Sequence, residues 1–232
     1  SNLSLVEYSN ISEMFHLTRT PRERYNFTQL STPPLRQYLA DVVDYYKLAL
    51  SSDEPYIKYI SFYHIMEYFY DEVFKKKMVS DLRNKITSPD FTYKNDDKVY
   101  EIAKFVNNRM RMDSKSGLGD EAESLKFVLM EYVPIEELRA RIGTIDSTAE
   151  TYYQTSKVVF CNAPSIAWSD VQGVYTQLCK RIYATRNSLI HSKSGRKHEL
   201  YHPYKDEPIL RKEIPLVKAV AELIIINSSS VL

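Results

Sequence analysis

Residues 51–74 read SSDEPYIKYISFYHIMEYFYDEVF, and this stretch decides the fold. Short polar residues precede Pro55, a pattern typical of a helix start, because they cap free N–H groups and proline fits the first turn. About twenty residues follow with apolar or aromatic side chains on nearly every face, and a helix that is hydrophobic all round is buried. We therefore expect this segment to form the central helix of a helical bundle.

Six further segments carry apolar residues at the three-and-four spacing of an amphipathic helix. They span residues 35–49, 99–110, 122–132, 134–142, 165–190 and 215–227. Gly143 is expected to end one of them, and Pro203 and Pro208 indicate a loop before the last. Residues 144–164 have weak periodicity, which predicts an ordered loop with at most one short strand at 157–160. The sequence thus predicts an all-α bundle of roughly six to eight helices.

The N-terminal residues 1–32 differ from the rest, since they have no apolar period and mix proline with arginine in TRTPRERYNF at 18–27. This predicts a linker or docking arm, followed by one helical domain over residues 33–232. No strand-like segment alternates apolar and polar residues cleanly, and the chain has only 5 glycines. Both observations argue against a Rossmann unit or a β-sandwich.

Charge and cysteine content narrow the classes of function. The formal net charge is +1, so contacts with nucleic acid would depend on a local basic patch. Cys161 and Cys179 lie far apart without CxxC spacing, which supports neither a disulfide framework nor a zinc finger. No apolar run is long enough to cross a membrane, and no signal-peptide pattern is present. We expect a reducing, cytoplasmic location, no membrane partner and, because the chain starts at Ser1, a domain of a longer protein.

Residues 184–199 read ATRNSLIHSKSGRKHE and raise the question of function. At about 100° per residue, Arg186 falls on the edge of the apolar stripe, whereas Asn187 and His191 lie one above the other on the opposite side. These side chains would meet solvent, a ligand or another subunit. Three cations follow directly: Lys193, Arg196 and Lys197. In the plainest interpretation, these three cations stabilise the negative end of the helix dipole at the C-terminus of the helix, and His191 is a capping residue.

A second interpretation comes from a resemblance. RNSLIH at 186–191 is similar to the RNxxxH form of the RxxxxH signature of the HEPN superfamily, and no other arginine in the chain has a histidine five positions on. The run YIKYISFYHIMEYFYDE at 56–72 resembles the aromatic-rich early helix in the C-terminal HEPN domain of ApeA-like anti-phage effectors. The two blocks stand in the expected order along the chain.

The resemblance implies a HEPN-like bundle and a metal-independent endoribonuclease without a cofactor. The RNA 2′-hydroxyl would attack the adjacent phosphate, leaving a 2′,3′-cyclic phosphate and a 5′-hydroxyl. His191 would act as the general acid and base, and Arg186 would bind the phosphate. Asn187 would orient either the phosphate or His191 through its side-chain amide. A homodimer that pairs two motif helices would supply a second histidine. Three cations would bind the RNA backbone without reading its sequence: Lys193, Arg196 and Lys197.

The resemblance also implies a biological setting, an effector in anti-phage defence or a toxin system that an N-terminal sensor domain or a regulatory protein controls. HEPN toxins paired with nucleotidyltransferase antitoxins are similar but carry RxxxxHxY, whose tyrosine accepts nucleotide groups. Lys193 stands at that position here, so control by modification of this tyrosine is not expected.

Glu67 raises a further question, because a carboxylate among aromatic residues needs a partner. His64, one turn earlier, and Arg186 are the candidates, and a pair with Arg186 would lock that arginine in place. Alternatively, Glu67 lies at a solvent-facing rim. A metal site made by His64, Glu67 and His191 is disfavoured, since HxxE is common and the resembled chemistry needs no metal.

Two other functions stay open. A HEPN module that only dimerises or binds a nucleotide would keep both the bundle and the motif. A helical scaffold of another class would use the 19 tyrosines for packing and interfaces. Cleavage of RNA would separate the ribonuclease from both alternatives.

Overall fold

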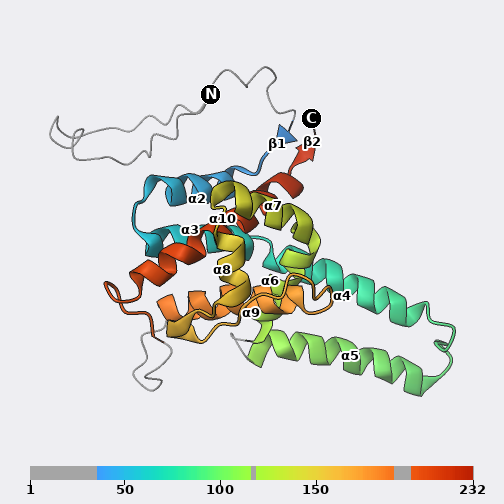
Figure 1. Ribbon diagram of the computed structural model, residues 1–232. Coiled ribbons are helices and arrows are strands. Elements are labelled where there is room, and N and C mark those ends of the chain that lie inside the picture. The colour runs from blue at the N-terminus through green and yellow to red at the C-terminus, as the bar shows by residue number, and fades with distance from the viewer. Residues whose placement is uncertain (1–35, 116–118, 191–199, 232) are drawn as a thin grey trace.

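The computed structural model describes residues 36–115, 119–190 and 200–231 of the chain. Most of these residues form α-helices that pack as a bundle, so the predicted all-α fold is confirmed (Figure 1). The helices are α2 (Ala40–Ser51), α3 (Pro55–Glu67), α4 (Tyr70–Ile86), α5 (Asp96–Lys115), α6 (Gly119–Tyr132), α7 (Ile135–Ile145), α8 (Ala149–Thr155), α9 (Val174–Ile190) and α10 (Glu207–Asn227). The predicted arm at 1–32 lies outside the described residues.

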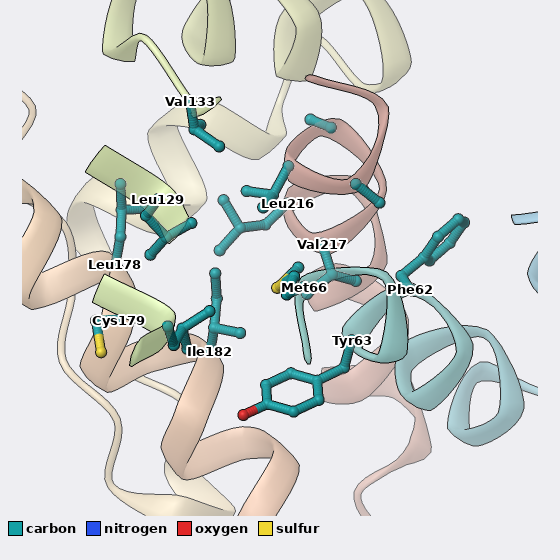
Figure 2. Packing of buried hydrophobic residues seen from close by; sticks show 14 of the residues in the cluster. Phe62, Tyr63, Met66, Leu129, Val133, Leu178, Cys179, Ile182, Leu216 and Val217 are labelled. Carbon is teal, nitrogen blue, oxygen red and sulfur yellow. The ribbon is translucent and has the colours of Figure 1, made fainter. Parts of the chain in front are cut away.

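The core forms around α3, as the all-round hydrophobic sequence predicts. Seven of the 13 residues of α3 are buried, and the helix packs against α2 and α10 and also contacts α9. Figure 2 shows side chains from α3, α6, α9 and α10 gathered around one interior, among them Phe62, Met66, Leu129, Ile182 and Val217. Burial of these large apolar groups is the main favourable contribution to folding.

The prediction of one uninterrupted helix through residue 74 is wrong, because α3 ends at Glu67 and α4 begins at Tyr70. At the break, the backbone N–H of Tyr68 donates to the His64 carbonyl at 3.0 Å, and that of Phe69 donates to the Met66 carbonyl at 3.2 Å. Tyr68 is exposed, whereas Phe69 stays in the core. The break redirects the chain, and the distal parts of α4 and α5 extend from the bundle as a hairpin (Figure 1).

The predicted stripe at 99–110 lies on this hairpin and is only partly buried. Val99 and Ala103 are exposed, and Ile102, Phe105 and Val106 are only half-buried. Val73 is the one buried residue of α4. Regular spacing of apolar residues therefore predicts the helix α5 correctly but not its depth in the fold.

Several predicted boundaries are wrong near the chain ends and loops. Residues Arg36–Gln37 form strand β1, which pairs antiparallel with β2 (Ser230–Val231), so α2 starts later than expected. Helix α7 continues through Gly143, where a side chain would meet only open space. The expected loop at 144–164 contains α8 and a 3₁₀ turn, η2 (Val159–Cys161), and its strand-like part is the single bridge Val158–Ala163.

Helix α9 begins at Val174 rather than at residue 165. The preceding residues form turns, in which the Asp170 carboxylate accepts the Gly173 N–H at 2.9 Å. An aspartate that binds nearby backbone in this way favours a turn over a helix interior. Within α9, Val174, Leu178, Ile182 and Leu189 are buried, as the apolar stripe predicts, whereas Val171 precedes the helix and is exposed.

The last helix, α10, also starts earlier than predicted and contains Pro215. Proline removes one N–H and obstructs the preceding turn, which usually breaks a helix. Here the Tyr153 hydroxyl accepts the Leu216 N–H at 3.0 Å and donates to the Lys212 carbonyl at 2.7 Å. These two groups would bond directly in a regular α-helix, so the phenol bridges the turn that proline disturbs.

A buried ion pair joins α9 to α10. Arg181 and Glu213 form two hydrogen bonds of 2.8 Å, with their side chains 0% and 1% exposed. Arg181 also donates to the carbonyls of Ser156 and Pro164, and the Tyr152 hydroxyl donates to Glu213 at 2.9 Å. A buried pair is tolerated only when such additional hydrogen bonds satisfy the remaining donors and acceptors.

Replacing Arg181 with methionine should destabilise the protein by about 3–5 kcal/mol, because it leaves the Glu213 carboxylate buried without its cation. Urea denaturation at pH 7 measures this free energy. The double variant Arg181→Met/Glu213→Leu should lose less than the single variant, since neither charge is then stranded. Arg211→Met, at an exposed pair with Glu207, is the control, with an expected change within about 0.5 kcal/mol. Equal losses at Arg181 and Arg211 would contradict the structural role of the buried pair.

Candidate active site

Arg186 lies on α9 where the end of α3 and the start of α6 approach it. Its side chain is 13% exposed. One guanidinium nitrogen, Nη2, donates to Glu67 Oε1 at 2.8 Å, and Nη1 donates to Glu121 Oε2 at 3.2 Å. The predicted contact between Glu67 and Arg186 is therefore present, while its role in catalysis stays a prediction.

Glu67 also meets the second partner expected from the sequence. His64 Nδ1 lies 2.7 Å from Glu67 Oε2, and the His64 ring stacks at a tilt on Tyr45. Burial by itself would raise the pKa of Glu67, but the hydrogen bond to His64 and the charge of Arg186 outweigh it and hold that pKa below its ordinary value. Glu67 is thus an ionised link between His64 and Arg186, not a free carboxylate on a rim.

Tyr63 forms an aromatic wall beside Arg186. The guanidinium carbon lies 5.1 Å from the Tyr63 ring centre, a cation–π distance. The Tyr63 hydroxyl accepts a 2.8 Å hydrogen bond from Tyr70, and burial raises the pKa of Tyr63. Arg186 Nε is buried on this side and finds no acceptor within the described parts of the chain.

The surroundings of Arg186 favour its charge. Burial alone would lower the pKa of this guanidinium, but Tyr63, Glu121 and Glu67 outweigh that cost and raise the pKa above its ordinary value. Arg186 is therefore a permanently charged, positioned hydrogen-bond donor. Such a group can bind a phosphate and stabilise negative charge that develops on it.

Asn187 lies closer to Arg186 than the predicted outward orientation implies. It is half-buried, and its side-chain oxygen accepts from Arg186 Nη1 at 3.2 Å. Tyr183 lies one turn earlier on α9. Burial raises its pKa, a hydrogen bond with Asn187 lowers it, and the charge of Glu121 raises it further. Asn187 and Tyr183 thus extend the cluster around the guanidinium.

His191, Lys193, Arg196 and Lys197 lie outside the described residues. Three members of the cluster were missed from the sequence: Glu121, Tyr63 and Tyr183. Glu121 carries no local signal, because an acidic residue in the first turn of a helix is explained by the helix dipole alone. Tyr63 is one of many aromatic residues in α3.

Within the described ranges, no group of three or more His, Cys, Asp or Glu side chains could hold a metal ion. None of the helices described there is both long and apolar enough to cross a membrane.

A groove of about 690 Å³ lies between α7 and α10, away from Arg186, and Arg141, Lys218 and Glu222 line it. Comparison of the chain with family models, curated proteins and solved structures found no match.

Replacing Glu67 with glutamine should lower the stability of the protein at pH 7 by about 1–2 kcal/mol, because a charged acceptor of Arg186 and His64 is lost. The folded-state pKa of Glu67 is depressed, so its contribution is complete above the ordinary value of 4.5 and disappears as the pH falls through the lower folded value. Urea denaturation between pH 7 and 3 should show the two proteins converging at the acidic end. Glu136→Gln, at an 85% exposed carboxylate, should change little at any pH. A Glu67→Gln variant with unchanged stability and cleavage would refute the positioning role.

Proposed function

We propose that the chain is a HEPN-type ribonuclease effector that cleaves RNA without a metal ion, in anti-phage defence or a toxin system. One observation carries the proposal. The two sequence blocks on which the resemblance rests, FYHIMEYF and RNSLIH, meet through the 2.8 Å hydrogen bond between Glu67 and Arg186, although 119 positions separate these residues. A helical scaffold of another class would also pair a partly buried glutamate with a cation, but the resemblance accounts for a pair made between these two blocks.

The chemistry follows from the residue types. The Arg186 guanidinium, held by Glu67 and beside Asn187, would bind the scissile phosphate and neutralise the charge of the pentacoordinate transition state. His191, five positions on, would transfer the protons, since a histidine titrates near neutral pH. The 2′-hydroxyl loses a proton and attacks phosphorus, and the 5′-oxygen leaves with a proton. The products are a 2′,3′-cyclic phosphate and a 5′-hydroxyl.

Two proton transfers need two groups, and the motif provides one histidine per chain. A homodimer with α9 of each subunit facing its partner would place two copies of the motif at one site. Ile190, the last residue of α9, is 40% exposed and is an apolar group available to such an interface. RNA is the proposed substrate, with Lys193, Arg196 and Lys197 as contacts to its backbone.

Incubation of end-labelled RNA with the protein in EDTA tests the function. We expect fragments with 2′,3′-cyclic phosphate and 5′-hydroxyl ends, and a rate about 10²–10⁴-fold lower for His191→Ala, since acid/base catalysis contributes an effect of this size. His202→Ala, at an exposed histidine outside the motif, should cleave like the wild type. RNA that is bound but left intact would favour the non-catalytic module, and cleavage that survives His191→Ala would exclude the assigned site.

Light scattering tests the dimer. The expected mass is twice the 27.1 kDa of the chain. Ile190→Glu should shift the mass toward the monomer and reduce cleavage together, because it puts a charge into the apolar contact. Val171→Glu introduces the same charge at an 84% exposed residue ahead of α9 and should leave both unchanged. A monomer that cleaves RNA at full rate would contradict the two-chain site.

A further inference from the structure

Arg186 faces two carboxylates, and the two differ in how firmly they are held. Glu67 is the last residue of α3, is 25% exposed, and binds Arg186 at 2.8 Å while His64 holds its other oxygen at 2.7 Å. Glu121 lies in the first turn of α6, is 33% exposed, and binds Arg186 at 3.2 Å. Glu67 therefore has two close partners that fix it. Glu121 binds Arg186 over a longer distance, has Tyr183 as its second partner, and is more open to solvent.

The cluster is closed to a phosphate as it stands. One guanidinium against two carboxylates leaves a formal charge of −1, which repels an anion. Both terminal nitrogens of Arg186 already face an acidic oxygen, and Nε is buried. A phosphate can bind this arginine with good geometry only if one of the carboxylates moves away.

Glu121 is the carboxylate that can leave. Arg186 Nη1 divides its donation between Glu121 and Asn187, each at 3.2 Å, so neither bond has the short length of a strong charged hydrogen bond. Glu121 would keep a favourable place after release, because the N-terminus of a helix stabilises negative charge. Loss of Glu67 would break two short contacts, to Arg186 and His64, whereas loss of Glu121 from Arg186 breaks one contact of 3.2 Å and leaves Tyr183 as a neighbour of Glu121.

We propose that Glu121 occupies the position of a phosphate oxygen on Arg186 and that the substrate phosphate must displace it. The inference rests on the proposed function for the identity of that phosphate as part of RNA, but the competition itself depends only on Arg186 and its neighbours. Glu121 is then a positioning residue that weakens substrate binding. A single small anion is disfavoured, whereas an RNA strand that makes further backbone contacts can displace the carboxylate.

Binding of inorganic phosphate to the full chain tests the displacement without any cleavage. In an NMR titration at fixed pH and ionic strength, the Arg186 Nε–H signal, assigned by its loss in Arg186→Lys, reports the site. Glu121→Gln should bind phosphate about two- to fivefold more tightly than the wild type, the range for removal of one partly exposed charge pair. Glu136→Gln makes the same charge change at a distant exposed site and should leave the affinity unchanged. With RNA, Glu121→Gln should lower KM by a similar factor and leave kcat nearly constant.

Equal phosphate affinity in Glu121→Gln and the wild type would overturn the inference, even if the protein cleaves RNA through His191. If Glu121→Gln binds phosphate more tightly than the wild type but the wild type does not cleave RNA, the displacement of Glu121 is upheld and the proposed ribonuclease function is rejected. If circular dichroism shows that Glu121→Gln is unfolded, Glu121→Asp takes its place, because the shorter side chain withdraws its carboxylate from Nη1. Equal affinity in that variant would overturn the inference in the same way.

Discussion

The buried ion pair of Arg181 and Glu213 is the constraint on which the arrangement of this protein depends. A guanidinium that loses all contact with water is stable only if every strong donor finds an acceptor, and here the acceptors come from α10 and from the carbonyls of Ser156 and Pro164. The pair therefore fixes α9 against α10 and against the irregular segment between α8 and α9. Any other position of α9 would strand a charge in the core.

Two arginines on one helix illustrate how surroundings separate a structural role from a chemical one. Arg181 is 0% exposed, and its carboxylate partner is equally buried, so no ligand can reach it. Arg186 lies little more than one turn later and at the edge of the bundle, where its carboxylate partners are 25% and 33% exposed. The first arginine holds the helix in place, and the second has partners near the surface that a ligand could displace.

The sequence predicts the parts of this structure that depend on local pattern. Continuous apolar character in α3 predicts its burial, and the rarity of a carboxylate in such a helix predicts that Glu67 needs a cation. The prediction failed where a distant side chain replaces a local rule. Proline at position 215 predicts a helix start, but the Tyr153 hydroxyl allows the helix to run through it. Glu121 meets Arg186 only through the packing of α6 on α9, which no spacing along the chain indicates.

A second tyrosine links these observations to the candidate site. The Tyr59 hydroxyl of α3 donates to the Ile182 carbonyl at 3.0 Å, one turn ahead of Arg186 on α9. Glu67 stands about two turns further along α3 and binds Arg186 itself, so α3 holds α9 at two points. Contacts at two points fix both the sliding and the rotation of one helix against the other. The direction of the Arg186 side chain is therefore set by the core, which explains why an aromatic helix and a polar motif so far apart in sequence form one unit.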